Sequence, residues 1–257
     1  MRIASWNVNS IRARLDRVAA WVRANQPDAL CLQETKAQDH EFPVAVFREL
    51  GYTSVVHGQK SYNGVAVLSP HPLDDVVRGF DDGGDEDDGT RLIAATVRGV
   101  RVYSAYVPNG QMVGSAAWDA KLHWLARLRR TLELRHQPDD LAAVCGDFNV
   151  APEERDVYDP QFWRTTVLFH PEARASLRHL CEFGLVDTLR LHHEEPALYS
   201  WWDYRMLAFP KNMGLRIDLI LATRALAARC TAAGIDREAR KGNLPSDHAP
   251  ITADFDL

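Results

Sequence analysis

The sequence predicts one α/β domain across residues 1–257, and three observations lead to this prediction. Short apolar runs typical of buried strands alternate with helical patterns up to the last residues. No Ser/Gly-rich spacer, low-complexity segment or solenoid repeat divides the chain. The hydrophobic content of 46% and the charged content of 25% are ordinary for a globular protein that buries a large core.

The N-terminal part of the chain is expected to fold as strand, helix and strand. Ile3–Trp6 is a short apolar run, and Ser10 suits the N-cap of a helix because its hydroxyl accepts from backbone amides. Apolar residues within Ile11–Val22 recur at helical spacing, and Asn25–Pro27 ends that helix. Ala29–Leu32 then predicts a second strand.

The next segments predict a helix and three strands. Val44–Leu50 has a helical pattern, and Gly51 suits the left-handed position after a helix. Gly64–Leu68 is an apolar run that precedes a Ser-Pro pair. Arg91–Val97 and Val100–Tyr106 are separated by two residues, Arg and Gly, which indicates a hairpin.

The remaining elements continue the alternation. A long helix is expected where an apolar face runs from Trp118 to Leu132, and the apolar run Leu141–Val144 predicts a strand after it. Pro171–Phe183 predicts another helix, which a glycine closes. Arg216–Ala222 and Ala249–Phe255 predict the last two strands.

Charge and hydropathy leave nucleic acid open as a partner. The formal net charge is −5, but Asp81–Asp88 holds six of the 35 acidic residues, which leaves 29 acids against 30 Lys and Arg elsewhere. We expect the acidic stretch to be a solvated turn; the alternative is that it repels DNA from the wrong face. No apolar run reaches membrane-spanning length and no signal peptide opens the chain, so we expect a cytoplasmic protein without a membrane partner.

The stretch around Asp147 carries the first candidate chemistry. Gly146 breaks the strand that precedes it, and a carboxylate and a carboxamide follow two residues apart, at Asp147 and Asn149. Because residues i and i+2 of an extended chain point to the same side, both side chains are expected to project together. A base or ligand beside a neutral donor suits a phosphate ester under attack. The alternative is an Asp-Asn turn, which is common after a strand.

Similar polar residues recur where other predicted strands begin or end. They are Asn7, Glu34, Tyr106, Asp147 with Asn149, Asp218, and Asp247 with His248. Sites in layered α/β folds gather where strand ends converge. Each residue also has a structural alternative: Glu34 as a solvated loop carboxylate, Tyr106 as a half-buried aromatic, Asp218 as the partner of Arg216, and Asp247 with His248 as a surface pair.

Together these groups favour metal-assisted hydrolysis over covalent catalysis. They combine carboxylates, amides, a phenol and an imidazole, and no nucleophilic Ser or Cys motif accompanies them. Hard oxygen ligands favour Mg²⁺ over zinc, and Mn²⁺ is the expected substitute.

An ordered series of motifs carries a resemblance to a known family. The motifs are Trp6-Asn7-Val8-Asn9, Leu32-Gln33-Glu34-Thr35-Lys36, Tyr106-Val107-Pro108-Asn109-Gly110, Gly146-Asp147-Phe148-Asn149, Gly214-Leu215-Arg216-Ile217-Asp218 and Ser246-Asp247-His248. In this order they resemble the exodeoxyribonuclease III family, the abasic-site endonuclease branch of the endonuclease/exonuclease/phosphatase superfamily. His57–Lys60, Gly184–Thr188 and Ser200–Arg205 resemble that branch in particular. The resemblance implies a four-layer sandwich resembling deoxyribonuclease I, in which two β-sheets pack face to face between helices.

The resemblance also implies which residues hold the metal. Glu34 would be its principal carboxylate, with Asn7 close by, and Asp247 would support the metal and phosphate site. The full set implied at the metal is Asn7, Glu34, Asp147, Asn149, Asp247 and His248.

Five residues would carry the reaction itself. By resemblance, Asp147 would activate water or protonate the leaving oxygen, and Asn149 would steady the pentacovalent phosphate. Asp218 would orient His248, which would contact the scissile phosphate. Tyr106 would donate to a phosphate oxygen or polarise the leaving group.

Four further residues are expected to bind substrate: Asn109, Trp201, Leu215 and Ile217. The resemblance places the last three around the sugar of an abasic nucleotide; the alternative is that all three are core residues. Trp201 and Trp202 are adjacent, so in extended chain they face opposite ways, and one can serve the core while the other lines a cleft.

The expected function is that of a Mg²⁺-dependent DNA-repair phosphodiesterase acting as a monomer. It would cut duplex DNA 5′ to an abasic site, trim blocked 3′ ends and degrade DNA in the 3′ to 5′ direction. One alternative is a superfamily phosphatase or phosphodiesterase that acts on a non-DNA phosphate ester; the Ser-Trp-Trp-Asp-Tyr-Arg stretch disfavours it. The other is a catalytically silent DNA-binding relative, which would not need the full set of polar groups.

Overall fold

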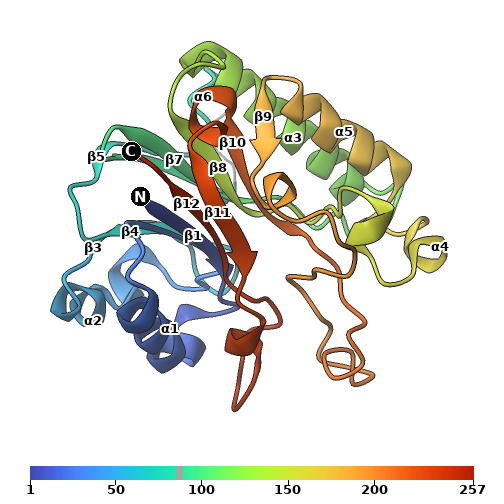
Figure 1. Cartoon of the computed structure of the whole chain (residues 1–257), viewed down its shortest axis with the longest axis horizontal. Coiled ribbons are helices and arrows are strands. Elements are labelled where there is room, and N and C mark those ends of the chain that lie inside the picture. The colour runs from blue at the N-terminus through green and yellow to red at the C-terminus, as the bar shows by residue number, and fades with distance from the viewer. Residues whose placement is uncertain (85–88) are drawn as a thin grey trace.

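Two six-stranded β-sheets form the centre of the computed structural model, which describes residues 1–84 and 89–257 (Figure 1). The first sheet has the order β11-β12-β1-β2-β4-β3, formed by Cys230–Ile235, Ile251–Phe255, Arg2–Asn7, Ala29–Gln33, Val65–Ser69 and Thr53–His57. The second has the order β5-β6-β7-β8-β10-β9, formed by Asp74–Arg78, Leu92–Val97, Val100–Tyr106, Ala142–Asp147, Asp218–Thr223 and Leu185–Asp187. β1 and β2 are parallel, as are β7 and β8, and the other neighbours are antiparallel.

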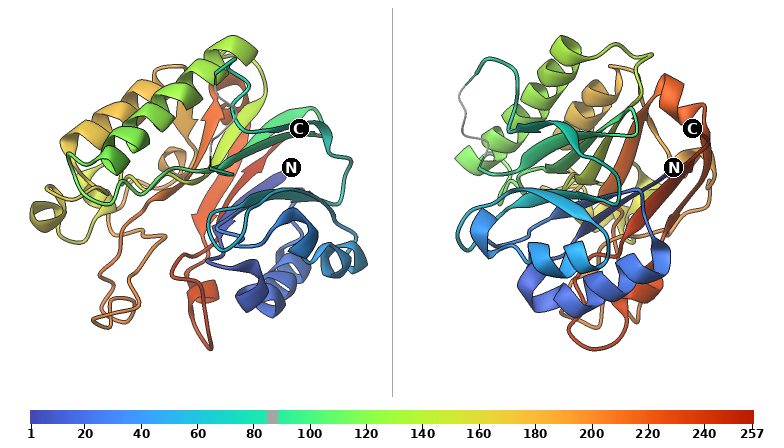
Figure 2. Two further views of the ribbon diagram at one scale, coloured as in Figure 1. Left: turned by 180° about the vertical axis from the view of Figure 1, so that it is seen from behind. Right: turned by 90° about the vertical axis from the view of Figure 1, so that its left-hand side faces the viewer.

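Helices cover the outer face of each sheet (Figure 2). The first sheet is covered by α1 (Ile11–Asn25) and α2 (Val44–Glu49), and the second by α3 (Ala116–Arg135) and α5 (Pro171–Cys181). The short elements are α4 (Pro160–Trp163), α6 (Arg224–Ala227), η1 (Asp39–Glu41), η2 (Glu154–Asp156), η3 (Leu189–Leu191) and η4 (Arg237–Arg240). The expected α/β four-layer sandwich is therefore confirmed. In the described parts of the chain, no helix is both long and apolar enough to cross a membrane.

Most interior strands are buried on both faces, which explains their continuous apolar sequences. In β1, Ile3 packs between the two sheets, whereas Ala4 and Trp6 pack with residues of α1 and α2. In β8, Ala143 belongs to the core between the sheets, whereas Val144 packs on the side of α3 and α5. Along a strand whose two faces are both buried, apolar and polar residues do not alternate.

The sequence predictions hold in the interior of both sheets and fail at their edges. The eight predicted strands correspond to the eight interior strands, with ends shifted by up to three residues. The four strands that the sequence did not indicate, β3, β5, β9 and β11, are the four edge strands. The helix signals are confirmed: Ser10 accepts from the amide of Ala13 at the start of α1, and Gly51 has a φ of +84° after α2.

Part of the acidic stretch Asp81–Asp88 is structural, which corrects the expectation of a wholly solvated turn. Asp82 is buried, and each of its carboxylate oxygens accepts from the Arg127 guanidinium at 2.9 Å. These hydrogen bonds lower the pKa of Asp82 to about 2. Residues 85–88 lie outside the described residues, so their expected effect on DNA stays a prediction.

Candidate active site

Side chains that end or adjoin the central strands meet at one end of the sandwich. In the first sheet, Asn7 ends β1, and Glu34 directly follows β2, the parallel neighbour of β1. In the second sheet, Tyr106 of β7 is in register with Asp147 of β8, which is in register with Asp218 of β10. The two sheets therefore bring together groups that are far apart in the sequence.

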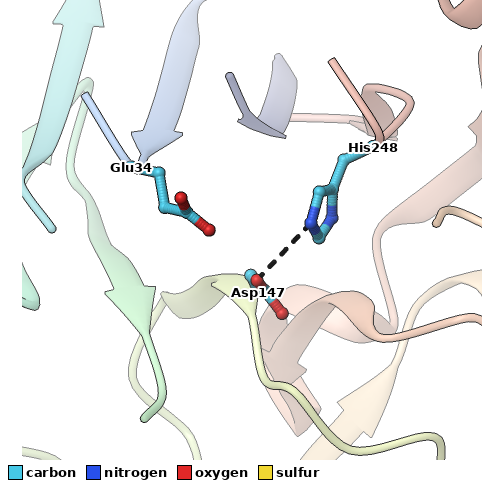
Figure 3. Close-up of side chains that lie close together, drawn as sticks. All are labelled: Glu34, Asp147 and His248. Atoms are coloured by element: carbon cyan, nitrogen blue, oxygen red, sulfur yellow. Dashed lines mark ion pairs between the residues drawn. The ribbon is translucent and has the colours of Figure 1, made fainter. Parts of the chain in front are cut away.

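Glu34, Asp147 and His248 point toward one another at the centre of this region (Figure 3). One ligand atom from each lies within 4.8 Å of the others. The Asn7 amide joins two of them, because its Nδ2 donates to Glu34 Oε1 and to Asp147 Oδ2, both at 2.9 Å. The Tyr106 hydroxyl donates to the same Glu34 oxygen at 3.0 Å. These five predicted site residues thus form one connected cluster.

His248 is held in place by Asp218. Its Nδ1 lies 2.8 Å from Asp218 Oδ2, and its Nε2 faces Asp147 Oδ2 at 3.8 Å. The Ser200 hydroxyl donates to Asp218 Oδ2 at 2.6 Å, so a second group fixes that carboxylate. Arg216 pairs with two other carboxylates, and the alternative that Asp218 is its partner is therefore wrong.

Asn149 and Asn109 extend the cluster on the side of Asp147. Asn149 Nδ2 donates to Asp147 Oδ2 at 3.2 Å, and Asn109 Nδ2 donates to Asn149 Oδ1 at 3.1 Å. The side chains of Asp147 and Asn149 do project together, but not from extended chain. The strand ends at Asp147, and Asn149 adopts a left-handed φ of +50° with its backbone amide donating to Asp147 Oδ1 at 2.9 Å. The stretch is both a turn and a part of the site.

The sequence matches the model of the Endonuclease/Exonuclease/phosphatase family over residues 4–248. The chain belongs to this family. It is 36% identical to exodeoxyribonuclease III of Haemophilus influenzae, with 99% of this chain and 100% of that protein aligned. It is 33% identical to the DNA repair nuclease APEX1 of Danio rerio, with 98% of this chain and 81% of that protein aligned.

Solved structures of the same family superpose on the whole chain. An AP endonuclease from Archaeoglobus fulgidus matches with a TM-score of 0.97 and 42% identity, and both chains are covered completely. The 3′-5′ exonuclease NExo from Neisseria meningitidis matches with a TM-score of 0.95 and 41% identity, again over all of both chains. NExo bound to a product DNA hairpin, described as a 3′ phosphatase, matches with a TM-score of 0.94 and 41% identity over both complete chains. The family resemblance of the sequence motifs is confirmed.

Burial and neighbouring charges shift the central pKa values of this family member. Burial raises the pKa of Asp147 to about 7, and repulsion from Asp218 and Glu34 adds to it while His248 opposes it. Burial alone would lower the pKa of His248, but attraction by Asp218 and Asp147 outweighs it and raises that pKa to about 10. The imidazole is therefore a cation near neutral pH, beside a carboxyl group whose proton is easily gained or lost.

The central residues fit a hard divalent cation. Glu34 and Asp147 direct carboxylate oxygens into one small region, the kind of ligand that such cations prefer. The pKa of Asp147 is raised mainly by its burial and further by the nearby negative charges of Asp218 and Glu34, and a bound cation would favour its ionised form. Lys36 already offsets part of the negative charge of Glu34, because its Nζ lies 2.8 Å from Glu34 Oε2. The cluster is therefore a candidate metal site.

Asp247 lies beside the three-residue cluster and connects to it through other side chains. Its Oδ1 accepts from Asn9 Nδ2 at 2.9 Å, and its Oδ2 accepts from Trp201 Nε1 at 3.0 Å. Asn9 Oδ1 in turn accepts from Lys36 Nζ at 2.6 Å, and Lys36 pairs with Glu34. Asp247 is thus connected to the Glu34 carboxylate through Asn9 and Lys36.

Two of the predicted substrate contacts belong to the core. Leu215 is 0% exposed and Ile217 is 2% exposed, and both pack in the cluster beneath α3 and α5. The structure thus shows both side chains packed in the core, and their assignment to the sugar pocket stays a prediction. Trp201 is half-buried and Trp202 is fully buried, so the two tryptophans do divide between surface and core.

Three residues of the site were not singled out from the sequence: Ser200, Asn9 and Lys36. Each lies inside one of the motifs that resemble the family, within two residues of a predicted site residue. The hydrogen bonds of Ser200 to Asp218 and of Asn9 to Asp247 join distant segments, and Lys36 pairs with Glu34 two residues away. Membership of a motif was therefore the only sequence signal for them.

Proposed function

We propose that this protein is a Mg²⁺-dependent DNA-repair nuclease that cuts duplex DNA on the 5′ side of abasic sites, trims blocked 3′ ends and digests DNA from the 3′ end. The observation that supports this most directly is the convergence of Glu34, Asp147 and the Asp218–His248 pair where both sheets end. The relatives named exodeoxyribonuclease III, DNA repair nuclease and AP endonuclease support the substrate. We further propose that it acts as a cytoplasmic monomer.

The proposed mechanism follows from the protonation states at the site. His248, held as a cation by Asp218, donates from Nε2 to an oxygen of the scissile phosphate. Asp147 takes the proton of the attacking water or returns one to the departing 3′-oxygen. The bond from the water oxygen to phosphorus forms as the bond from phosphorus to the 3′-oxygen breaks, which leaves a 3′-hydroxyl and a 5′-phosphate.

Two neutral side chains, Tyr106 and Asn149, assist the charged side chains of the site. Burial raises the pKa of Tyr106 far above its usual range, and the nearby Glu34 carboxylate raises it further, so its hydroxyl keeps the proton that it donates. The Asn149 amide donates to the phosphate oxygens as the charge on them grows. Mg²⁺ bound by Glu34 and Asp147, with Asn7 beside them, would neutralise part of that charge.

Exposed apolar side chains near the site support a large partner. Met112, Met206 and Leu207 are 68%, 75% and 67% exposed, in the segments that follow β7 and precede β10. The segments before β10 and between β11 and β12 project past the strand ends at the end of the sandwich where β1 finishes (Figure 1). Apolar side chains of this kind insert between base steps in proteins that bend DNA.

A labelled duplex with one abasic analogue tests the proposal. With Mg²⁺ we expect one cut 5′ to the analogue that leaves a 3′-hydroxyl, and with a chelator we expect none. The same duplex without the analogue should be shortened only from its 3′ ends. Hydrolysis of inositol phosphates without DNA cleavage would favour the phosphatase alternative, and DNA binding without cleavage would favour the silent relative. Either result would contradict the proposal.

A further inference from the structure

Lys121 of α3 is an ammonium group buried in the protein core. Its side chain is 0% exposed and lies on the same face of the helix as Trp118, Leu125 and Leu128. Lysine is almost never fully buried unless a partner compensates its charge. No carboxylate of the described residues forms an ion pair with Lys121. Burial lowers the pKa of its amine to about 7, and the charge of Asp147 opposes that shift without contact. Other acceptors must therefore hold this charge.

Three backbone carbonyl oxygens hold it. Lys121 Nζ donates to the carbonyls of Asn109 at 3.1 Å, Asn149 at 2.7 Å and Val167 at 2.6 Å. An ammonium group has three donors, so its capacity is used completely. The carbonyls come from the loop after β7, the turn after β8 and the segment before α5. One buried side chain thus ties together three separate stretches of chain.

Two of these stretches carry residues of the site. Asn109 donates to Asn149, and Asn149 donates to Asp147, through their side-chain amides. Lys121 holds the peptide carbonyls of both asparagines while those amides extend into the site. A shift of either carbonyl would move the amide relative to Asp147.

Gly110 provides the room that the lysine side chain needs. Its φ is +93°, and a Cβ at this position would lie 3.0 Å from Lys121 Cδ and 3.4 Å from Trp118 Cε3. A larger residue at position 110 would therefore press on the lysine stem. The glycine that closes the Tyr-Val-Pro-Asn-Gly motif and the buried lysine belong to one arrangement.

We propose that Lys121 is a positioning residue for phosphodiester cleavage, which fixes the Asn109 and Asn149 peptides so that the Asn149 amide meets the reacting phosphate. The proposal rests on the proposed function of the site. Hydrogen bonds from a charged donor are shorter and stronger than neutral ones, and three of them in different directions define one position. A displacement of about 1 Å in an active site can lower turnover about 10²-fold.

Lys121→Met tests this role, because it keeps the apolar stem and removes the donors. We expect kcat on the abasic duplex to fall about 10²-fold at saturating Mg²⁺ while KM changes little. Hydrogen exchange should quicken at residues 107–112 and 148–151. Leu128→Ala is the matched control on the same helix face and should lower thermal stability without either effect. Unchanged kcat in Lys121→Met, or an equal fall in Leu128→Ala, would overturn the proposal.

Two further variants separate positioning from stability. Lys121→Arg, which retains donors, should recover part of kcat, and Lys121→Gln replaces Lys121→Met if that variant does not fold. In an Asn149→Ala background, Lys121→Met should lower kcat little further, since the Asn149 amide that Lys121 positions is already gone. Additive losses of kcat in the double variant would contradict the positioning role. If the wild-type protein cuts no DNA, the proposed function fails, while the exchange comparison still decides whether Lys121 fixes the two loops.

Discussion

The pairing of Asp218 with His248 yields a quantitative prediction about the reaction. Asp218→Asn keeps an acceptor oxygen for His248 Nδ1 and for the Ser200 hydroxyl, but removes the negative charge. The pKa of His248 stands at about 10 against a usual 6.5, and Asp218 is the strongest of the groups that raise it. The whole shift corresponds to about 5 kcal/mol. If Asp218 supplies about half, the pKa of His248 falls by about two units in the variant.

The change has a definite sign with pH. Because folding raises the pKa of His248, the stability that this residue contributes is complete below the unfolded value of 6.5 and is lost as pH rises through about 10. In Asp218→Asn the folded pKa of His248 is lower, so the loss is smaller and is complete at a lower pH, and the imidazole of the folded protein gives up its proton at that lower pH. The variant should therefore keep more of its activity at pH 6 than at pH 9, where the smaller fraction of cationic imidazole should lower kcat about 10-fold.

The assay is the pH dependence of kcat, together with an NMR titration of the His248 ring. Asp254→Asn serves as the control, since Asp254 lies on β12 and pairs with Arg2, away from the site. It should leave the alkaline limb of the profile unchanged. An identical alkaline limb in the parent and in Asp218→Asn would refute the reasoning, as would additive losses when Asp218→Asn is combined with His248→Asn.

Four more outcomes are expected. Glu34→Gln should weaken Mg²⁺ binding in calorimetry and lower kcat strongly at an unchanged Tm; near-normal activity at low Mg²⁺ would exclude its metal role. Trp201→Ala should fold and lose cleavage at abasic sites more than digestion of normal ends, and an equal loss of both would count against the pocket. Asp82→Ala removes both carboxylate oxygens that accept from the Arg127 guanidinium and should lower the free energy of unfolding in urea by about 3 kcal/mol; an unchanged unfolding curve would show that the pair is unimportant. Serine in place of the acids at 85–88 should strengthen nonspecific DNA binding at low salt; an unchanged salt slope would leave them as solvated charges.

The sequence predicts the interior of the fold because burial on two faces leaves a strong signal. A run such as β8 or β10 is apolar throughout, and no polar alternation interrupts it. An edge strand has one neighbour and often one wet face, so its composition resembles a loop. In β5, Asp74–Arg78, no residue is fully buried. The missing strands therefore reflect the physics of sheet edges and not an irregularity of this fold.

The site was predictable as a set of residues but not as a set of contacts. Polar groups at strand ends stand out, because the strands themselves are apolar. Leu215 and Ile217 do not stand out, since an apolar residue in a strand has the same signature whether it lines a cleft or the core. Lys121 was not predicted because a lysine in an amphipathic helix is usually exposed to solvent, whereas this one is buried. Its spacing from Trp118 and Leu125, three and four residues, was the available signal that it faces inward.

Backbone conformation at the site shows why local patterns are insufficient there. Asn9, Glu34, Lys36 and Asn149 all have left-handed φ values, of 44°, 50°, 49° and 50°. Such a conformation costs an L-residue roughly 1–2 kcal/mol, and glycine would remove that cost together with the side chain. The chain keeps the side chains, so contacts between distant segments must stabilise these turns, as Lys121 does at the Asn149 carbonyl. Strain of this kind persists only where the surrounding structure over-determines it, and at these four positions it lies in or beside the proposed site.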